Sequence, residues 1–501
     1  MPIPISRVLV ANRGEIALRI IRACHEEGLE AVAVYSEADR SAPYVRAANA
    51  AVPIGPSPAA QSYLVMDKII AAARATGAQA IHPGFGFLSE RAAFAAAVVE
   101  AGLVFVGPPA SAIQAMGDKT EARRRMQAAG VPVVPGAMTA LTDPAEAARV
   151  AESLGYPVLV KAAAGGGGKG MRVVARAADL GSALASAASE AQKAFGDPAV
   201  YLEKFIERPR HVEIQILADH ERTIHLGERE CSVQRRHQKL LEEAPSIAVD
   251  PALRERMGQA AVAAARAVGY RSAGTCEFLL ASDGSFFFLE MNTRIQVEHP
   301  VTELVYGVDL VREQLRIAQG LPMTVAPGSL SPRGWAIECR ITSEDPANNF
   351  LPSTGRITYL KAPAGPGIRW DSGVETGDEV TLFYDSMLAK LIVHGATRLD
   401  AIVRMERALA ELVITGVATN QPVHLRLLAD SDFRAGRIDI QFLERRPDLI
   451  PAAPGEELIE RLAVVAALAE EERRQRQKPA VAVDDQASSA WLARGRAEGL
   501  R

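Results

Sequence analysis

The stretch KAAAGGGGKGMRVV (Lys161–Val174) places four consecutive glycines between two apolar segments that read as strands. Glycine loses more backbone freedom on folding than any other residue, so a run of four indicates a place that needs bare or mobile backbone. The formal GxGxxG inside this stretch does not predict a dinucleotide site, because the strand-like MRVVA follows where that fingerprint must open a helix. A P-loop is excluded as well, since no Ser or Thr follows the Gly-Lys pair.

We therefore predict a hairpin in which PVLVKAAA and GMRVVA pair and the glycines form the tip. An ordinary long hairpin turn is the plainer interpretation. A mobile glycine tip can instead close over a nucleotide and direct backbone N–H groups at its phosphates. Lys161, at the end of the first strand, would then supply a positive charge for phosphate.

A second informative stretch is FFFLEMNTRIQVEHP (residues 286–300), which alternates polar and apolar residues from Glu290 to Glu298. Period-two alternation predicts one extended strand with a polar face. That face would carry Glu290, Asn292, Arg294, Gln296 and Glu298. An edge strand with a solvated face would show the same pattern. Acids, amides and a guanidinium without a lysine favour a binding role over solubility.

The segment GTCEFLL (residues 274–280) reads as the partner strand, with a Ser-Asp-Gly turn between the two. This pairing would bring Glu277 near Glu290 and Asn292. Several oxygen ligands without His or Cys suit Mg²⁺, which bridges nucleotide phosphates. Two facing carboxylates repel each other without a cation, although a nearby arginine could neutralise them equally well.

A basic cluster lies in ERECSVQRRHQKLLEEAP (residues 228–245). Its members are Arg235, Arg236, His237 and Lys239, and the acids that bracket them are Glu228, Glu230, Glu242 and Glu243. A solvated charge run or an RNA contact is the plainer interpretation. The bracketing acids argue against a nucleic-acid stripe and favour a basic pocket for a small anion. His211, in the strand-like RPRHVEIQIL, by itself favours a structural role.

The rest of the chain divides into further units. RVLVAN, IALRIIRACHEEG and EAVAVYS open a strand–helix–strand alternation that is typical of a Rossmann-like fold, but its first turn, NRGE, lacks the dinucleotide fingerprint. Residues 335–445 show short strands (WAIECRI, GRITYLK, AKLIVHG) and a helix near AIVRMERALAEL. After Pro447, EELIERLAVVAALAEEERRQRQ predicts a helix, followed by a flexible connector.

Bulk composition narrows the class of protein. A net charge of −4 over 501 residues gives no nucleic-acid footprint. The four cysteines show no CxxC spacing, which disfavours a disulfide framework or a structural zinc site. No secretory signal and no apolar run long enough for a membrane span is present, so a cytoplasmic protein is the simplest expectation.

Taken together, the ordered motifs resemble those of the biotin carboxylase family over about residues 5–445. They are LVANRGEIALRIIRAC, HPGFGFLSE, MGDK, KAAAGGGGKGM, ECSVQRRHQK, EFL, EMNTRIQVEHPVTE, ECRI, NFLPSTG and YDSM. The resemblance implies an α/β and α+β chain with a Rossmann-like N-terminal domain (1–115) and an ATP-grasp domain (116–330). The latter would carry a mobile glycine-rich lid at about 133–205. A biotin carboxylase C-terminal domain (331–447) and a helical, flexible tail (448–501) would follow.

The same resemblance implies roles for individual residues. ATP contacts are expected from Lys119, Lys161, Gly165, Gly166, Gly167, Gly168, Met171, Glu203, Lys204, Ile206, His211, Gln234, His237 and Leu279. The metal ligands would be Glu277 and Glu290, with Asn292 nearby. Lys239, Arg294, Gln296 and the Val297 backbone would bind bicarbonate, Glu298 would be the general base, and Arg340 would face the biotin ureido group.

The activity implied is ATP-dependent carboxylation of biotin, with bicarbonate activated as carboxyphosphate and with Mg²⁺ or Mn²⁺ as cofactor. Biotin would arrive on a separate carrier protein, and a carboxyltransferase subunit would complete an acetyl- or propionyl-CoA carboxylase. The alternatives are a component of a pyruvate carboxylase, another ATP-grasp ligase, and a non-catalytic subunit that binds ATP.

Two departures from the family pattern stand out. Phe85 replaces a tyrosine common in HPGYGF near the biotin entrance, so a hydroxyl contact with biotin is lost. Pro366 occupies a position where some dimeric members carry an interface aromatic residue, whereas Arg22 and Arg369 still match dimer positions. A homodimer is therefore expected on weaker grounds than the activity.

Overall fold

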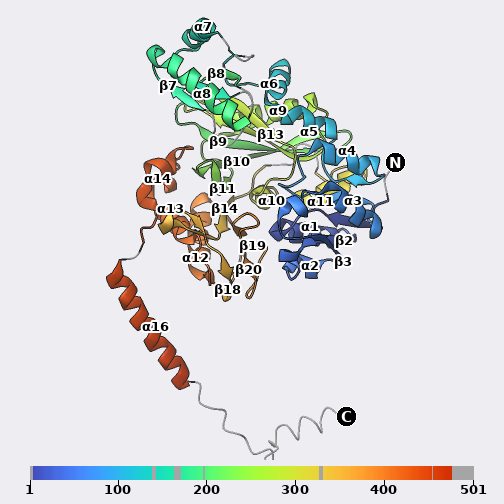
Figure 1. The fold of residues 1–501 in the computed structure, drawn as a ribbon, viewed down its shortest axis with the longest axis vertical. Coiled ribbons are helices and arrows are strands. Elements are labelled where there is room, and N and C mark those ends of the chain that lie inside the picture. The colour runs from blue at the N-terminus through green and yellow to red at the C-terminus, as the bar shows by residue number, and fades with distance from the viewer. Residues whose placement is uncertain are drawn as a thin grey trace, which may run out of the picture. The chain divides into compact units, whose positions relative to one another are not determined.

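The computed structural model describes residues 4–137, 141, 143–162, 171–195, 198–325, 331–453 and 455–476. The chain forms two compact units, Met1–Pro451 and Ala452–Arg501. The first unit contains a five-stranded, an eight-stranded and a three-stranded sheet, together with small two-stranded ribbons (Figure 1). Among the described residues, no helix is long and apolar enough to cross a membrane.

The N-terminal part is a parallel sheet in the order β3-β2-β1-β4-β5, which confirms the Rossmann-like prediction. Its strands are β1 (Arg7–Val10), β2 (Glu30–Ser36), β3 (Ala50–Gly55), β4 (Ala80–His82) and β5 (Val104–Phe105). The helices between them are α1 (Gly14–Glu26), α2 (Pro43–Ala47), α3 (Met66–Ala75) and α4 (Ala92–Glu100), and α5 (Ala110–Gly117) follows. Crossover helices bury both faces of such a sheet, which explains its apolar strands.

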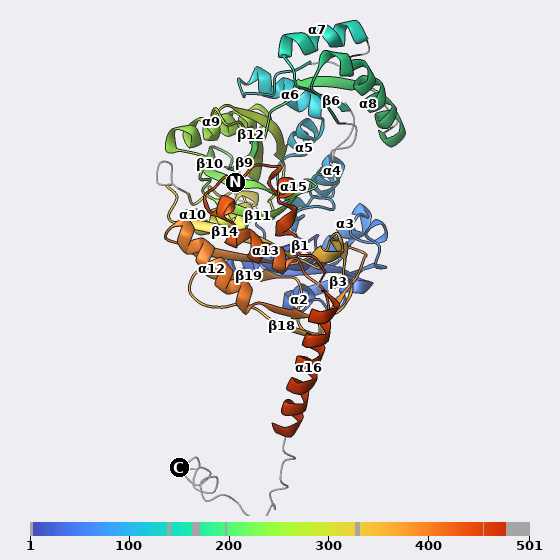
Figure 2. The same ribbon diagram turned by 90° about the vertical axis from the view of Figure 1, so that its left-hand side faces the viewer.

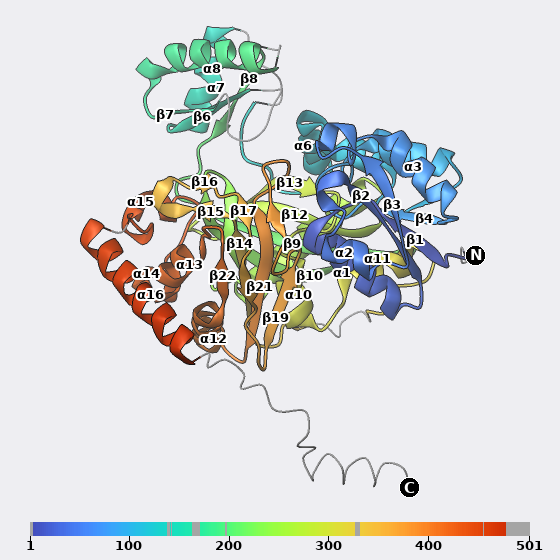
Figure 3. The ribbon, with the colours of Figure 1, turned by 60° about the horizontal axis from the view of Figure 1, so that its bottom comes forward.

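The centre of the first unit is an antiparallel sheet in the order β13-β12-β9-β10-β11-β14-β21-β19 (Figure 3). Its strands are β9 (Arg210–Ala218), β10 (Thr223–Arg235), β11 (Gln238–Ala244), β12 (Ser272–Leu280), β13 (Phe286–Asn292), β14 (Trp335–Thr342), β19 (Ile368–Ser372) and β21 (Met387–Gly395). Strands from both sides of residue 330, where we predicted a domain boundary, therefore belong to one sheet. The boundaries themselves stay predictions.

One face of this sheet is apolar and the other is polar. Val212, Ile214 and Ile216 of β9 share a core with Met257 of α9 (Pro251–Ala267). Because successive side chains of a strand point to opposite faces, His211, Glu213 and Gln215 lie on the other face. A strand that is buried on both sides but polar on one must satisfy those polar groups with one another.

Helices and short ribbons complete the first unit. The helices are α6 (Lys119–Ala128), α10 (His299–Tyr306), α11 (Leu310–Ala318), α12 (Arg398–Glu411), α13 (Gln421–Ala429), α14 (Ser431–Arg434) and α15 (Phe442–Arg445). The short strands are β15 (Glu344–Asp345), β16 (Leu351–Pro352), β17 (Gly355–Arg356), β18 (Tyr359–Lys361), β20 (Glu379–Val380) and β22 (Val413–Thr415). The helix predicted near AIVRMERALAEL is confirmed as α12, which packs on β14 and β21.

The predicted pairing of the two strands of the glycine hairpin is confirmed. Strand β6 (Val158–Ala162) pairs antiparallel with β7 (Arg172–Val174) and, on its other side, with β8 (Val200–Lys204). Helices α7 (Pro144–Leu154) and α8 (Leu180–Phe195) pack on this small sheet, which lies at the top of the view in Figure 2. Gly165, Gly166, Gly167 and Gly168 lie outside the described residues.

The second unit contains one described helix, α16 (Glu456–Arg476). Its bounds agree with the helix predicted from EELIERLAVVAALAEEERRQRQ. The connector predicted after it lies outside the described residues.

Candidate active site

A cavity of about 790 Å³ opens over the polar face of the eight-stranded sheet. Its wall includes thirteen of the residues assigned from the sequence: Phe85, Met171, His211, Gln234, His237, Lys239, Glu277, Glu290, Asn292, Arg294, Gln296, Val297 and Arg340. These residues come from seven separate parts of the chain. The fold thus brings the predicted bicarbonate, metal and biotin residues into one space.

Lys239 is the centre of the charge arrangement in this cavity. Its Nζ lies 2.6 Å from Glu213 Oε2, 2.9 Å from Glu277 Oε1 and 2.6 Å from Glu298 Oε1. Burial alone would lower the pKa of Lys239, but the three carboxylates raise it well above its usual value. Lys239 is therefore a permanent cation, and it holds together carboxylates from β9, β12 and the start of α10.

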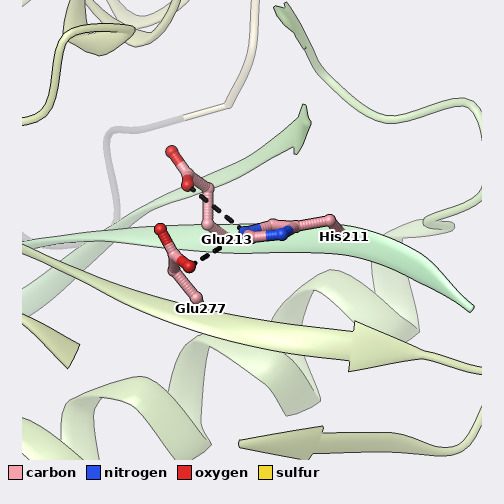
Figure 4. Close-up of side chains that lie close together, drawn as sticks. All are labelled: His211, Glu213 and Glu277. Carbon is pink, nitrogen blue, oxygen red and sulfur yellow. Dashed lines mark ion pairs between the residues drawn. The ribbon is translucent and has the colours of Figure 1, made fainter. Parts of the chain in front are cut away.

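His211 lies between two of these carboxylates, as Figure 4 shows. Its Nε2 is 3.1 Å from Glu277 and 3.9 Å from Glu213, while its Nδ1 lies 3.0 Å from the Gln234 amide nitrogen. Burial lowers the pKa of His211, but the charge of Glu277 outweighs this and raises it. His211 therefore belongs to the polar network of the cavity wall, whereas its position in the sequence favoured a structural role.

The three side chains in Figure 4 are close enough to hold a metal ion. Glu213, however, already accepts from Lys239 with one oxygen and from Arg229 Nε, at 2.5 Å, with the other. Both carboxylate oxygens thus face protein cations. We interpret this cluster as an ion-pair network that supports the cavity wall, with Glu277 as the member shared with the predicted metal site.

The predicted metal site lies at the end of the β12–β13 hairpin. Glu277 is directly opposite Glu290, and Asn292 donates to Glu277 Oε1 at 2.9 Å, as the predicted pairing requires. Glu290 is exposed on the cavity wall, whereas Glu277 is buried. These oxygen donors fit Mg²⁺, which prefers carboxylates and keeps several waters.

Replacing Glu290 with Ala is expected to raise the Mg²⁺ concentration needed for half-maximal activity and to lower kcat. The substitution removes one hard oxygen ligand and leaves Glu277 in place. A magnesium titration of ATP turnover measures the effect, with Glu375→Ala, an exposed acid outside the cavity, as the control. An unchanged titration curve in the Glu290 variant would show that the metal ligands were misassigned.

The chain beyond Asn292 differs from the sequence prediction. Strand β13 ends at Asn292, and residues 293–298 form bends and a turn before α10 begins at His299. The predicted extended strand to Glu298 is therefore wrong. The polar residues still converge, because the turn redirects them: Arg294 donates to Gln296 Oε1 at 2.8 Å, and Gln296 donates to Glu277 Oε1 at 3.0 Å.

Two further contacts hold this turn in place. Glu90 accepts from Arg294 Nε at 2.9 Å and from the Thr293 backbone N–H at 3.0 Å. Lys390, which is fully buried, donates to the Val297 carbonyl at 2.6 Å. The backbone of the predicted bicarbonate pocket is thus anchored from two different parts of the chain.

Glu298 is fully buried directly behind the cavity wall. Besides Lys239, it accepts from Arg340 Nη2 at 3.0 Å. Burial alone would raise the pKa of Glu298, but Lys239 and Arg340 outweigh burial and hold it well below its usual value. Glu298 is an anion at neutral pH, which a proton acceptor must be.

The lid residues form a second cluster on the three-stranded sheet. Glu203 is paired with both Lys161 and Arg123. Lys204 donates to the Gly155 carbonyl at 2.7 Å, so its side chain is bonded within the lid. Ile206 is half-buried just after β8. Among the described residues, none of the predicted lid contacts except Met171 lines the cavity.

Two other predicted ATP contacts have distinct placements. Leu279 lies opposite His211 in the β9–β12 pairing and is half-buried. Lys119 is the first residue of α6, and its side chain lies outside the described part of the structure.

The predicted basic pocket is only partly correct. Arg236 and His237 form the two-residue turn between β10 and β11, and both have positive φ. Arg235 stacks on Phe350, with its guanidinium carbon 4.0 Å from the ring centre, and Arg236 reaches Asn349. Neither arginine lines the cavity, so its positive charge on this strand pair comes from Lys239.

Phe85 lies on the cavity wall. Its carbonyl accepts from Asn12 Nδ2 at 2.7 Å, which ties the loop after β4 to the end of β1. The expected dimer residues differ in environment. Arg22 and Pro366 are exposed, whereas Arg369 donates to Glu303 at 2.6 Å and to Asp371 at 2.8 Å within the chain.

Some residues of the site were not identified from the sequence. They are Glu213 and Arg229, which support Lys239, together with Glu90, Glu338 and Lys390. A charged side chain inside the apolar run HVEIQIL is the signal that could have found Glu213, whereas Arg229 lies in the polar run GERECSV and has no such contrast. Glu90 and Lys390 come from distant segments, and no local pattern marks them.

Comparison with known proteins identifies related sequences along most of the chain. The family description "Biotin carboxylase, N-terminal domain" matches residues 4–113, and "Biotin carboxylase C-terminal domain" matches residues 338–445. Residues 118–326 match "Carbamoyl-phosphate synthase L chain, ATP binding domain". The three matches follow one another along the chain without overlap, and the eight-stranded sheet takes strands from the second and the third.

Individual relatives are similar over nearly their full length. A pyruvate carboxylase subunit of Methanothermobacter thermautotrophicus is 53% identical over 440 residues, 88% of this chain and 89% of the relative. Biotin carboxylase 1 of Bacillus subtilis is 52% identical over 442 residues, 88% of this chain and 98% of the relative. Among solved structures, the biotin carboxylase domain dimer of Hydrogenobacter thermophilus 2-oxoglutarate carboxylase, with MgADP, ADP and bicarbonate, has a TM-score of 0.83. It is 46% identical and covers 90% of this chain and 99% of that one.

Proposed function

Because this chain belongs to the biotin carboxylase family, we propose that it catalyses the first half-reaction of a biotin-dependent carboxylase on biotin carried by a separate protein. The chain is an ATP-dependent ligase that carboxylates biotin. The observation that carries the residue assignment is the single cavity in which Lys239, Arg294, Gln296 and Arg340 meet above the buried Glu298.

In this proposal the cavity binds bicarbonate by charge and by hydrogen bonds. Lys239 and Arg294 supply positive charge, and the Gln296 amide and the backbone at Val297 orient the anion. Bicarbonate would otherwise not bind beside the phosphates of ATP, because like charges repel. The hydrogen bond from Lys390 to the Val297 carbonyl keeps this short backbone segment in one position.

Glu298 is the general base that removes the bicarbonate proton. A carboxylate can do this when it lies within about 2.6–3.2 Å of the proton donor, and it must be ionised. Lys239 and Arg340 keep Glu298 ionised, so its efficiency depends on position more than on high basicity. The same two cations stabilise negative charge that develops beside them.

Glu277 and Glu290, with Asn292 nearby, are the residues that would hold Mg²⁺. The ion, when bound, neutralises charge on the phosphates and on the transferred phosphoryl group. Glu203, Lys204 and Ile206 would contact the adenine side of ATP, and Lys119 and Lys161 the phosphates. Lys161 pairs with Glu203 in this structure, so binding of phosphate at Lys161 would have to replace that ion pair.

Arg340 faces the ureido group of biotin. Its Nε and Nη2 bond to Glu242 and Glu298, and among the described residues Nη1 makes no hydrogen bond. Nη1 is therefore available to a substrate oxygen on the cavity side. Carboxyphosphate hydrolyses in water, which gives a reason for a lid that closes over the site.

The proposal also covers the protein that carries biotin and the final acceptor of the carboxyl group. In the proposal, biotin arrives on a separate carrier protein. An acetyl- or propionyl-CoA carboxylase, with a role in fatty acid biosynthesis, is the first choice. A component of a pyruvate carboxylase is the alternative, because a relative at 53% identity carries that name.

A homodimer is proposed from the dimer named for the Hydrogenobacter relative, with the exposed Arg22 as a contact. The tail beyond residue 447 is proposed to dock on the carrier or the transferase, with Trp491 as anchor. A cytoplasmic location is in keeping with four unpaired, buried cysteines.

Purification of the native complex tests the carrier and acceptor together. The complex is supplied with ATP, labelled bicarbonate and, in turn, acetyl-CoA, propionyl-CoA, pyruvate and 2-oxoglutarate. We expect label in one acyl-CoA product and in a separate biotinylated chain. Label in the keto acid products alone would replace the first choice with the alternative.

A further inference from the structure

The four acids that bracket the basic cluster each bind a different arginine. Glu228 binds Arg254, Glu230 binds Arg210, Glu242 binds Arg340, and Glu243 binds Arg398. Arg340 is the one of these four arginines that lines the cavity. The pair formed by Glu242 and Arg340 therefore differs from the other three in facing substrate.

Glu242 has a second acid beside it. It lies directly opposite Glu338 in the pairing of β11 with β14, and both side chains are fully buried. Residues opposite each other on paired strands have Cβ atoms roughly 5 Å apart. Among the described residues, three oxygens of this pair have no hydrogen-bond partner: both carboxyl oxygens of Glu338 and Oε2 of Glu242.

Two buried carboxyls at this separation do not both ionise, because each charge is desolvated and repels the other. A proton on one of them relieves the repulsion and also provides a donor for the other. Glu242 accepts from Arg340 Nε at 2.6 Å, so Glu242 is the member with a cation partner. Glu338 is the member on which a proton would remain.

Besides its bonds to Glu242 and Glu298, Arg340 is anchored through its backbone. Its carbonyl accepts from Asn420 Nδ2 at 2.8 Å, and His424 Nε2 lies 2.9 Å from the same oxygen. These contacts fix the position of the Arg340 backbone, but they do not fix the direction of its guanidinium. The bonds from Nε to Glu242 and from Nη2 to Glu298 orient the guanidinium plane, and Nη1 is the nitrogen without a hydrogen bond among the described residues.

We propose that Glu242 is a positioning residue for Arg340, and that a protonated Glu338 donates the hydrogen bond that the second oxygen of Glu242 lacks. The inference rests on the proposed role of Arg340 toward biotin. It adds that the orientation of the Arg340 guanidinium depends on the charge of Glu242, and that the hydrogen bond from Glu338 stabilises that charge.

The titration of the pair agrees with this arrangement. Burial raises the pKa of Glu242 to about 7, with Arg340 opposing and Glu298 adding to the rise, and burial raises the pKa of Glu338 well above its usual value. Above pH 7 Glu242 is charged and holds Arg340, and below pH 7 it loses that charge. The other titratable groups that interact electrostatically with the pair are Lys239 on β11, Cys231 on β10, Cys339 on β14, Glu298 before α10 and Lys390 on β21.

Four variants of the full chain test the proposal. Glu242→Gln should raise the KM for free biotin about tenfold, while bicarbonate-dependent ATP cleavage without biotin changes less than twofold. Glu338→Leu removes the donor that stabilises ionised Glu242, so the fall of kcat/KM for biotin should move to higher pH by about one unit, whereas Glu338→Gln keeps a neutral donor and should leave the profile in place. Glu228→Gln, a buried acid bound to Arg254 away from the cavity, is the matched control and should show the wild-type profile. All rates are compared with wild type at each pH, because the bicarbonate available also changes with pH.

Two results would overturn the proposal. One is an equal loss of the biotin-dependent and biotin-independent rates in Glu242→Gln, and the other is an unmoved pH profile in Glu338→Leu. Glu242→Asp, which keeps the charge, should recover part of the biotin KM. Arg340→Lys separates the two levels of inference. If Arg340→Lys leaves the KM for biotin unchanged, the proposed role of Arg340 fails. If it raises that KM while Glu242→Gln does not, the positioning role alone fails.

Discussion

Replacing Glu298 with Gln is expected to lower bicarbonate-dependent ATP cleavage by about 10²–10⁴-fold, the range typical of losing a positioned general base. The amide keeps the shape of the side chain but cannot accept the bicarbonate proton. ATP binding should change little, because the predicted nucleotide contacts lie on the lid and around Glu277. Steady-state ADP release with and without bicarbonate, together with a nucleotide-binding titration, measures both effects.

The Glu228→Gln variant serves as the control for this measurement as well, since it places the same substitution at another fully ion-paired, buried position. It should retain bicarbonate-dependent turnover. A Glu298→Gln variant with near-normal turnover would rule out Glu298 as the base, whatever its effect on stability.

Replacing Lys239 with Met is expected to have the largest effect on stability. The change leaves Glu213, Glu277 and Glu298 without their shared cation, and breaking a buried ion pair by removing one partner costs about 3–5 kcal/mol. Arg229, His211 and Arg340 remain as single partners, so we expect a destabilised protein rather than no folded protein. Activity should be lost together with stability, because Lys239 also lines the bicarbonate pocket.

The pH dependence gives this prediction a distinct signature. In the wild type, the pKa values of Glu277 and Glu298 are lowered, so their contribution to stability is present above the unfolded pKa near 4.5 and is lost as the pH falls through the folded values. Without Lys239 these carboxylates repel, and protonation relieves the repulsion. The stability deficit of Lys239→Met relative to wild type should therefore shrink between pH 7 and pH 5.

Denaturation midpoints at the two pH values measure this deficit, with Lys239→Arg as the charge-conserving control. The arginine variant should lose less stability and show no narrowing of the gap at low pH. A Lys239→Met deficit that is the same at pH 7 and pH 5 would show that Lys239 does not neutralise the three carboxylates.

The local pairings could be predicted from the sequence because they depend on short patterns. The β6–β7 hairpin followed from two apolar runs around the glycines, and the β12–β13 register placed Glu277 opposite Glu290 as expected. The Rossmann-like sheet followed from its strand–helix alternation. In each case the pattern is local, lying within one hairpin or one strand–helix–strand unit.

The path after Asn292 could not be predicted in the same way. The alternation from Glu290 to Glu298 has the period of a strand, yet the backbone turns at residue 293 because Glu90, 203 residues away, binds the Thr293 N–H. Tertiary contacts here override the local pattern. The residues still converge, but they converge around Lys239 instead of along one flat face.

The charges around the basic cluster show a related limit. The sequence places four basic residues together, but the turn at Arg236 and His237 directs Arg235 and Arg236 to the Asn349–Phe350 segment. Which member of such a run enters a cavity depends on partners from β9, β12 and α10. Those partners are known only once the eight-stranded sheet is assembled.

The measurement that tests the central claim most directly is ADP release by the purified chain with ATP and Mg²⁺, in the presence and absence of bicarbonate and of free biotin. We expect ATP cleavage to depend on bicarbonate and label from bicarbonate to appear in carboxybiotin. ATP cleavage that proceeds equally without bicarbonate, with no label in biotin, would contradict the assignment of this cavity as the site of biotin carboxylation.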